Sequence, residues 1–399
     1  MVLGTLAGNP YAGMAWMHMQ IAAGLRRLGH DAVYLETTSS WPYDPLREQK
    51  LPNSEYAVPY LSRVADTFGL GDAWAYRRSY SDRAWLGPVA ARGDALLREA
   101  DAVFNVAGAT RLAEDGLTAR NLVYFGTDPG FHEAGYENGE PEARAIVDEH
   151  DAAVTYGENI GTPECPLPPL PRLAARTRQP VLLDLWGAGS VAPSVYSTVT
   201  NWKQDGREVE FRGERYLWSK DVEFAKFVDV PRLAGVAVEL VTNLAPPESM
   251  RYGEGEPVKT RGVNPDERAR LEDGGWRLVD ARKLTEDPWP YRDYIVGSRA
   301  ELSVARDLNV RLRSGWFSER SACYLAAGRP VVAQDTGFGA VLPVGEGLFP
   351  FSTAEEAVDA VRTIEGDYER HRRGARAVAE ECFRAETVLA KLLGDLGLA

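Results

Sequence analysis

Short apolar strands alternate with helical segments along most of this chain, and this alternation constrains its fold more than any other feature. A strand is predicted over Val2–Ala7, a helix with apolar residues at helical spacing follows, and a second strand is predicted over Ala32–Leu35. Such a unit predicts parallel neighbours, because the helix returns the chain to the same end of the sheet. Further strands of this half are expected over Ala102–Val106, Leu122–Phe125 and Ala152–Tyr156.

A proline-rich segment, Pro163–Pro171, interrupts the alternation. Proline neither continues a helix nor fits inside a sheet, so we interpret this segment as an interdomain linker. The alternation then resumes, with strands predicted over Val181–Leu185, Tyr196–Thr200, Val236–Val241, Trp276–Asp280, Leu302–Ala305 and Val331–Ala333, and with helices beginning near Ser219, Asn264 and Thr353. The sequence therefore predicts two α/β domains, residues 1–170 and 171–375, and a terminal helical segment, residues 376–399.

The stretch Trp41–Trp85 does not follow this pattern. It is rich in Tyr, Trp, Pro and Arg and shows no regular apolar period. We therefore interpret it as a large insertion that faces the space between the two domains.

Composition limits the classes of function. The 399 residues are too many for one ordinary core, and a net charge of −13 argues against a nucleic-acid or anionic-membrane partner. The three cysteines, Cys165, Cys323 and Cys382, are far apart and form no C-x-x-C pair, which favours a reducing cytoplasm over a disulfide frame or a zinc site. We expect neither a signal peptide nor a membrane span, since no apolar run approaches about twenty residues.

The segment Ser314–Phe338 carries the strongest functional signal. Gly315 opens a turn, Ser318 is suited to cap the helix that follows, and Gly328 is suited to end that helix before a buried strand. The helix start then presents free N–H groups and a positive dipole end, which favour a phosphate. Asp335 and the residues after it would lie just beyond the strand, where open α/β sheets hold their ligands.

Each candidate in and near this segment has a simpler structural explanation that stays open. Ser318 is either a helix cap alone or also a phosphate contact, and Arg320 is either an exposed cation or a partner of a pyrophosphate. Asp335 is either a turn former or a ligand of sugar hydroxyls. Asn201 follows the predicted strand Tyr196–Thr200 and Lys220 begins the next helix, and both are either solvent-facing or part of the same site.

The motif residues of the second half resemble those of the group 1 glycosyltransferases. That family carries G-x-P-V-V-A-x-D-x-G-[GF], which is matched here by Gly328, Pro330, Val331, Val332, Ala333, Asp335, Gly337 and Phe338. In the first half, the spacing of Gly13, Gln20 and the closing Gly29-His30 is similar to that of the plant-type UDP-glycosyltransferases. The resemblance implies the GT-B architecture, an α/β fold of two Rossmann-like domains facing each other across a cleft. It also implies a final helix that crosses back to the first domain.

The sequence departs from both families at catalytic positions. Gly315 and Cys323 stand where the group 1 family carries the two glutamates of E-x7-E, and Glu319 is one turn away on the same helix face. Met14 stands where the plant-type enzymes carry a histidine base, and His18 follows one turn later.

The catalytic base is therefore sought among other first-domain residues. Asp128, after the strand Leu122–Phe125, and His18 are the leading candidates, and Glu158 and His132 are the reserves.

The resemblance implies a glycosyltransferase that moves a sugar from a nucleotide diphosphate sugar to a small acceptor. The transfer would use no cofactor and no metal, because no D-x-D pair stands out, and inversion is slightly favoured. The donor-binding residues would be Gly13, Asn201, Lys220, Gly315, Ser318, Glu319, Arg320, Ser321, Asp335, Thr336, Gly337 and Phe338. A sugar-nucleotide epimerase of the same fold and a catalytically degenerate nucleotide-sugar-binding protein are the alternatives.

Overall fold

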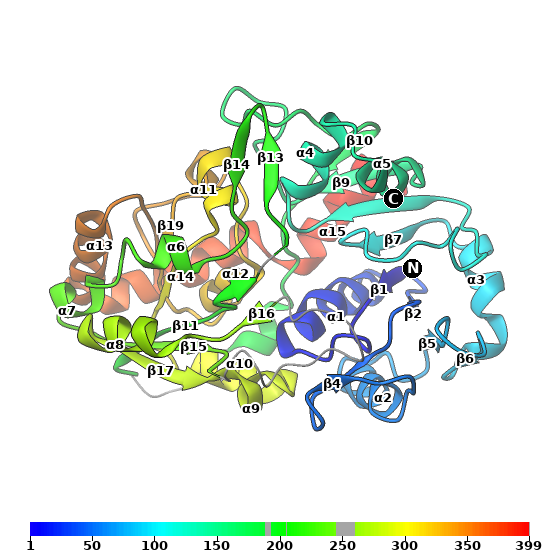
Figure 1. Ribbon diagram of the computed structural model, residues 1–399, viewed down its shortest axis with the longest axis horizontal. Coiled ribbons are helices and arrows are strands. Elements are labelled where there is room, and N and C mark those ends of the chain that lie inside the picture. Colours follow the sequence, from blue (N-terminus) through cyan, green and yellow to red (C-terminus); the bar gives the residue numbers. More distant parts are fainter. Residues whose placement is uncertain (188–192, 205, 245–259, 399) are drawn as a thin grey trace.

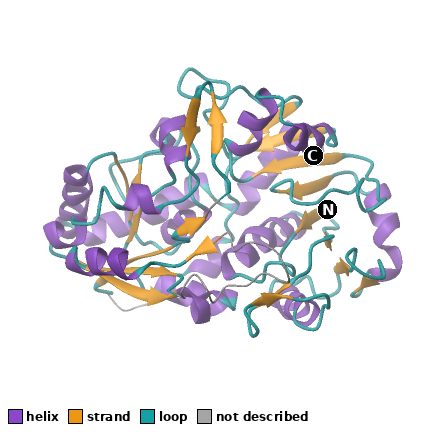
Figure 2. Cartoon of the chain, viewed as in Figure 1, coloured by secondary structure: helices purple, strands orange, loops and turns teal. Residues whose placement is uncertain are grey.

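The computed structural model describes residues 1–187, 193–204, 206–244 and 260–398. The chain forms two α/β domains that lie side by side, the first coloured from blue to blue-green and the second from green through yellow to orange and red (Figure 1). Helices cover the strands of each sheet, and both chain ends lie on the first domain (Figure 2). The confirmed fold class is therefore α/β with two Rossmann-like domains.

The first domain contains an eight-stranded sheet in the order β10-β9-β8-β7-β1-β2-β5-β6, parallel except for the edge pair β5–β6. Its strands are β1 Val2–Gly4, β2 Tyr34–Thr37, β5 Trp74–Arg77, β6 Trp85–Leu86, β7 Val103–Val106, β8 Leu122–Gly126, β9 Ala152–Thr155 and β10 Leu173–Arg176. A separate small hairpin pairs β3 Tyr43–Asp44 with β4 Gln49–Lys50. The helices are α1 Ala12–Arg27, α2 Ala57–Thr67, α3 Gly93–Glu99, α4 Phe131–Glu137 and α5 Pro141–Asp148.

The second domain contains a parallel six-stranded sheet in the order β17-β15-β11-β18-β19-β20. Its strands are β11 Val195–Val199, β15 Ala237–Thr242, β17 Trp276–Asp280, β18 Glu301–Ser303, β19 Val331–Gln334 and β20 Leu348–Phe351, with β12 Lys203–Gln204 and β16 Thr260–Arg261 as a separate pair. Its helices are α6 Asp221–Phe224, α7 Val230–Ala234, α8 Pro265–Asp273, α9 Ala281–Thr285, α10 Pro288–Val296, α11 Asp307–Leu312, α12 Glu319–Ala326, α13 Ala354–Gly366 and α14 Tyr368–Cys382.

Two helix starts follow the predicted capping chemistry. The Asn264 side chain accepts the N–H of Glu267 at the start of α8, and Thr353 does the same for Glu356 at the start of α13. In both cases the glutamate side chain accepts a hydrogen bond from the backbone N–H of the N-cap residue, which completes a capping box.

Three expectations need correction. Strand β10 follows the proline-rich segment and pairs with β9, so the chain leaves the first sheet after Arg176 and not at the predicted linker. The predicted strand Val181–Leu185 is a single bridge from Val181 followed by a 3-10 turn, because these apolar residues fill the space between the domains. The predicted insertion Trp41–Trp85 contains α2 and β5, whose aromatic side chains belong to the core.

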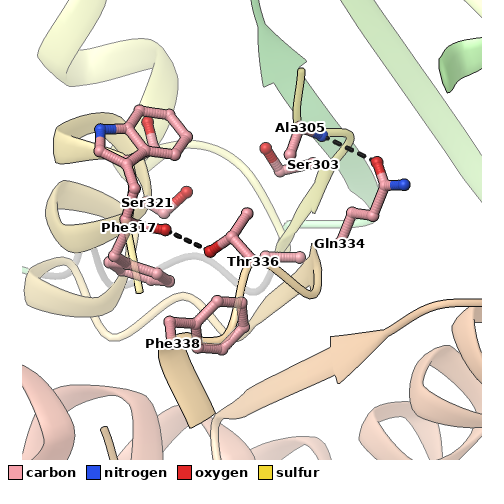
Figure 3. A pocket seen from close by; sticks show the side chains of 10 residues that line it. Ser303, Ala305, Phe317, Ser321, Gln334, Thr336 and Phe338 are labelled. Atoms are coloured by element: carbon pink, nitrogen blue, oxygen red, sulfur yellow. Dashed lines mark hydrogen bonds between the residues drawn. The ribbon is translucent and has the colours of Figure 1, made fainter. Parts of the chain in front are cut away.

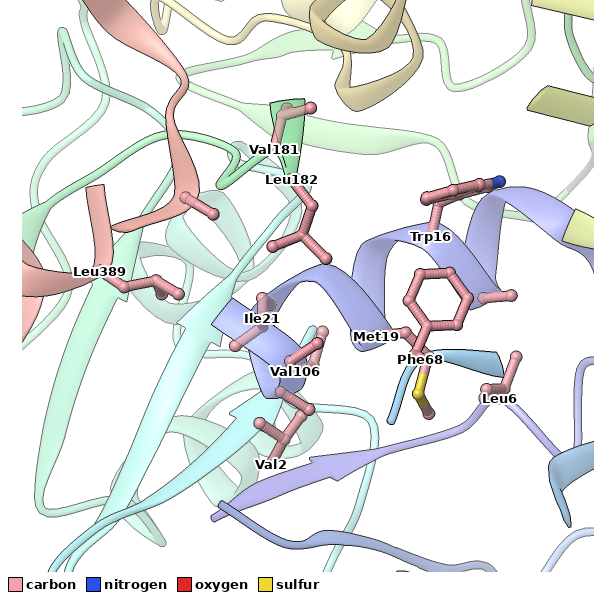
Figure 4. Close-up of a cluster of buried hydrophobic side chains, with 14 of the residues drawn as sticks. Val2, Leu6, Trp16, Met19, Ile21, Phe68, Val106, Val181, Leu182 and Leu389 are labelled. Carbon is pink, nitrogen blue, oxygen red and sulfur yellow. The ribbon is translucent and has the colours of Figure 1, made fainter. Parts of the chain in front are cut away.

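The largest core crosses the domain boundary around α1. Trp16, Met19 and Ile21 of this helix pack among buried residues from both halves, including Leu182 (Figure 4). The final helix, α15 Ala385–Asp395, supplies Leu389 to the same cluster and lies against α1. The chain therefore ends on the first domain.

A hairpin inserted after β11 joins the domains a second time. Strands β13 Val209–Phe211 and β14 Glu214–Tyr216 extend from the second domain, and β13 packs against α4 of the first. Their apolar side chains share a core with first-domain residues such as Ile160 and Leu167 and with Leu308 of α11. Both domains therefore contribute side chains to this second apolar junction.

Candidate functional site

A small pocket lies at the carboxyl ends of β18 and β19, beside the start of α12. The side chains that line it are Ser303, Ala305, Trp316, Phe317, Ser318, Ser321, Ala333, Gln334, Thr336 and Phe338 (Figure 3). Carboxyl ends of parallel strands are where open α/β sheets bind ligands, so the location agrees with the predicted donor site. The predicted residues Ser318, Ser321, Thr336 and Phe338 all belong to this lining.

Two glycines bring the pocket loops into direct contact with the first domain. Gly315 has φ of 77° and Gly337 has φ of 87°, and an added Cβ at either position would lie within 3 Å of Asn159. The Asn159 amide donates hydrogen bonds to the carbonyls of Arg313 at 3.1 Å and of Gly337 at 2.9 Å. The conformation of both predicted loops is therefore fixed by a first-domain residue.

The residues after β19 serve mainly to hold these loops. Asp335 accepts the N–H of Gly337 at 2.8 Å and pairs with Arg313 at 3.0 Å, which is the turn-forming explanation of this residue. The Thr336 hydroxyl donates to the carbonyl of Trp316 at 2.5 Å, as the dashed line in Figure 3 shows. Phe338 is buried against Phe317, with ring centroids 5.2 Å apart.

Arg320 is not an open anion receptor. Its guanidinium donates to Glu301 at 2.5 Å, to the carbonyl of Val199 at 2.7 Å and to the Ser303 hydroxyl at 2.8 Å. The Glu301 side chain is fully buried, so the pair ties α12 to β18 and β11. The interpretation of Arg320 as an exposed cation was therefore wrong, and its role as a partner of pyrophosphate stays a prediction.

Four other arginines close to this segment in the sequence also pair with carboxylates. Arg299 pairs with Glu365 at 2.6 Å, and Arg306 pairs with Asp128 at 2.6 Å. Arg311 and Arg313 pair with Asp307 and Asp335 at 3.2 and 3.0 Å, respectively. The density of arginines in this segment therefore does not create a corresponding excess of free positive charge.

Lys220 differs from these arginines. It precedes α6, only 8% of its surface is exposed, and within the described residues its ammonium group makes no hydrogen bond or salt bridge. Burial lowers the pKa of Lys220 well below its usual value, and the neighbouring Arg320 and Arg306 lower it further. Burial therefore disfavours the charged form of Lys220, and an anion bound beside it would favour that form again, so the position is suited to an anion.

Asp128 lies where the first domain meets this site. It follows β8, its side chain is 41% exposed, and Arg306 reaches it from the end of β18. The Arg306 guanidinium also lies 3.9 Å from the ring centroid of the buried Trp218. Of the two leading base candidates, Asp128 is therefore the one at the domain junction.

His18 does not face the junction. It is completely buried beneath β1, its Nδ1 lies 2.7 Å from the carbonyl of Met14, and burial lowers its pKa to about 4. Because a catalytic base must reach its substrate, this burial argues against the role assigned to His18 from the sequence. Gly13 lies in the first turn of α1, exposed and with no atom close to its Cβ position, so this site does not require glycine.

The reserve candidates are held by neighbours. Nδ1 of His132 lies 2.6 Å from the Tyr124 hydroxyl, and burial lowers the pKa of His132 to about 4. Glu158 pairs with Arg178 at 2.6 Å, and burial raises the pKa of Glu158.

Glu319 links the second domain to the first. Its carboxyl accepts a bond from the Gln20 side chain at 2.9 Å, and burial raises its pKa to about 8. The other end of the Gln20 amide accepts from the backbone of Leu182 and from Trp186, so its orientation is fixed. Cys323 is buried next to this link, with its sulfur 3.9 Å from the Gln20 nitrogen.

Two predicted residues make no specific contact of the expected kind. Ser318 occupies the N-cap position of α12, but its side chain makes no capping hydrogen bond. Asn201 is exposed in the loop after β11, where its carbonyl accepts the Thr200 hydroxyl.

The structure adds residues that sequence reasoning missed. Asn159 and Glu301 shape the site from distant positions in the sequence, and Trp316, inside the segment Ser314–Phe338, donates across the junction to the carbonyl of Thr127 at 3.0 Å. Asn159 follows a strand and a turn, which is the one sequence signal that could have marked it.

Among the described residues, no group of three or more His, Cys, Asp or Glu side chains is arranged to hold a metal ion. In the same part of the chain, no helix combines the length and the apolar character needed to cross a bilayer.

Comparison with known proteins identifies the architecture. No family model matches the sequence, and no curated protein does. The structure of Anabaena Alr3699/HepE in complex with UDP-glucose covers 100% of this chain and 99% of its own, with a TM-score of 0.55 and 12% identity. Sucrose-phosphate synthase from Thermosynechococcus elongatus covers 99% of this chain and 97% of its own, with a TM-score of 0.51 and 12% identity.

The chain has the GT-B fold. A glycosyltransferase from Rickettsia africae is similar over 98% of this chain and 96% of its own, with a TM-score of 0.50 and 11% identity. Within the GT-B fold, the pocket and Lys220 belong to the second domain, and Asp128 belongs to the first.

Proposed function

We propose that the protein is a glycosyltransferase that moves a sugar from a nucleotide diphosphate sugar to a small acceptor. The GT-B fold supports this proposal, and HepE, which has the same fold, binds UDP-glucose. In the proposed arrangement the second domain holds the donor, and the first domain holds the acceptor. UDP-sugars are therefore the first donors to test.

Lys220 is the observation that carries the proposal. A departing diphosphate develops negative charge, and a preorganised cation in a water-poor site stabilises that charge without reorganising. The ammonium group of Lys220 is buried and has no partner among the described residues, so a diphosphate would supply its missing counter-ion. We assign Lys220 to the leaving group, and we propose that the transfer needs no metal.

The proposed acceptor chemistry uses Asp128. An attacking hydroxyl loses its proton during the reaction, and a carboxylate at the domain junction is suited to accept it. Arg306 holds Asp128 at 2.6 Å and fixes its position between the two domains. We propose a single displacement with inversion, in which Asp128 takes the proton while the diphosphate leaves toward Lys220.

The first experiment is a thermal-shift panel of nucleoside diphosphates and their sugars, because a ligand that binds only the native state raises its stability. We expect UDP and at least one UDP-sugar to raise Tm, and Lys220→Met to reduce the rise. If no nucleoside diphosphate in the panel shifts the wild-type protein, the proposed donor class is wrong.

The second experiment tests the base with an acceptor panel and the active donor. Asp128→Asn should lower turnover by about a hundredfold while UDP still binds. Asp148→Asn, on the exposed surface of α5, is the matched control and should retain turnover. Near-normal turnover of Asp128→Asn would remove Asp128 from the mechanism, and product anomers read by NMR would decide inversion.

A further inference from the structure

The loop between β1 and α1 is closed around a buried carboxylate. The backbone N–H groups of Ala7 and Gly8 donate to the two oxygens of Glu36 at 2.7 and 2.6 Å. The Tyr34 hydroxyl donates to the same carboxylate at 2.9 Å, and Glu36 is 0% exposed. Short N–H bonds to a carboxylate are charge-assisted, so this is a strong set of contacts.

The two preceding N–H groups of the loop are bound as well. The N–H of Leu6 donates to the Tyr34 hydroxyl at 2.9 Å, and the N–H of Thr5 points at Nε2 of His18 at 3.4 Å. His18 accepts there because its Nδ1 hydrogen is directed to the Met14 carbonyl, which can only accept. Four consecutive loop N–H groups therefore bind side chains of the same domain.

No cation competes for Glu36. Among the described residues, no lysine or arginine pairs with it, and the ionisable groups packed nearby are His18, Tyr34, Tyr60 and Tyr76. Burial lowers the pKa of His18 and raises the pKa of each tyrosine, so these groups are neutral near pH 7. The loop amides and one hydroxyl therefore carry the stabilisation of the carboxylate.

Convergent backbone N–H groups after the first strand are what Rossmann-type loops use to hold a ligand's phosphate. We propose that Glu36 is the resident anion of this loop and occupies the place where such a phosphate would bind. Glu36 thus fixes the loop without a ligand and leaves the donor diphosphate to the second domain. The statement about the donor rests on the proposed function, whereas the position of Glu36 in the loop does not.

The experiment removes the internal anion and supplies a small one. Hydrogen exchange of the peptide covering residues 5–13 is measured at pH 8 in the wild type, Glu36→Ala and Glu36→Gln. We expect both variants to exchange at least tenfold faster in this peptide. Sodium formate should restore protection and Tm in Glu36→Ala, relative to sodium chloride of equal strength. It should do neither in Glu36→Gln, where the side chain fills the space.

Glu133→Gln is the matched control. Glu133 is also a buried glutamate that accepts a backbone N–H, from Gly130 at 2.7 Å, but it lies in α4. Its substitution should leave exchange of residues 5–13 unchanged. Unchanged exchange in Glu36→Gln, or equal effects of formate and chloride on Glu36→Ala, would overturn the proposal. If Glu36→Ala does not fold, the exchange of Glu36→Gln decides.

UDP affinity separates the two proposals. We expect the UDP dissociation constant of Glu36→Gln to stay within twofold of the wild type. A tenfold loss would place the diphosphate on the loop and overturn the assignment of Glu36. Absence of UDP binding to the wild type would refute the proposed donor instead, and the exchange and formate results would still decide the role of Glu36.

Discussion

The carboxyl edges of the two domains differ in how their charges are matched. At the first-domain edge, loop N–H groups already hold the Glu36 carboxylate. At the second-domain edge, Arg320 is paired with Glu301, but Lys220 has no partner among the described residues. The first-domain edge therefore holds an internal carboxylate, whereas the second-domain edge holds a buried lysine that has no counter-ion among the described residues.

The largest expected effect tests whether Arg320 is structural. Arg320→Met leaves the buried Glu301 without its counter-ion, so the free energy of unfolding should fall by about 3–5 kcal/mol. Urea denaturation followed by circular dichroism measures this loss. A loss below about 1 kcal/mol would mean that the guanidinium contributes little to the fold and is available to a ligand.

The second prediction concerns the pH dependence of stability that the buried Glu36 carboxyl creates. Burial raises the pKa of Glu36 from 4.5 to about 7, so below pH 4.5 the carboxyl is protonated in both folded and unfolded protein. Between pH 4.5 and pH 7 the carboxyl ionises in the unfolded state before it does so in the folded state, so the free energy of unfolding falls by about 3 kcal/mol. Well above pH 7 the carboxyl is ionised in both states, and this loss stays constant.

Glu36→Gln cannot ionise and should lack this loss. The difference between the unfolding free energies of wild type and variant should therefore change between pH 4.5 and pH 8 in favour of the variant. His18 titrates in both proteins and cancels in the comparison. A pH-independent difference would show that the carboxylate is not penalised by its burial.

The third prediction concerns Lys220 at the second-domain edge. Lys220→Met should weaken UDP binding by about 1.5–3 kcal/mol, the range for a charged hydrogen bond. It should not lower stability, because burial disfavours a charged group at this position. Calorimetry and urea denaturation measure the two effects. A variant that loses stability but binds UDP normally would show that the lysine is structural.

The smallest effect compares two helix starts. Thr353→Ala removes a capping hydrogen bond of α13 and should cost about 1 kcal/mol. Ser318→Ala removes no such bond from α12, and its cost in the ligand-free protein should be below about 0.5 kcal/mol. Equal costs in thermal unfolding would mean that the Ser318 hydroxyl caps its helix in solution.

The fold was predictable because its signals are local. The strand Trp276–Asp280 was predicted, from the strand–helix alternation, with the bounds that the structure has. The strand predicted over Val181–Leu185 was wrong, because residues buried between two domains are as apolar as those of a buried strand. Only the tertiary structure distinguishes the two cases. The aromatic stretch that contains Trp74 failed for a related reason, since dense aromatic residues can fill a core as well as a binding cleft.

The site was predictable only in its location. The position of Lys220 and of the pocket lining follows from strand ends and helix starts, which short motifs reveal. The partners of these residues are remote in sequence: Asn159 contacts Gly337, and Arg320 binds Glu301. A basic side chain without an acidic partner can be recognised only when the positions of all its neighbours are known. Sequence alone therefore did not distinguish Lys220 from the paired arginines.

The hairpin β13–β14 limits how this protein can be divided. By sequence the hairpin belongs to the second domain, but its Phe211 and Tyr216 complete a core with Ile160 and Leu167. A fragment that ends at Arg176 would therefore leave part of that core open to solvent. Exchange of whole domains with another GT-B protein would break the same junction, so a working chimera must take the hairpin and the surface beneath it from one parent.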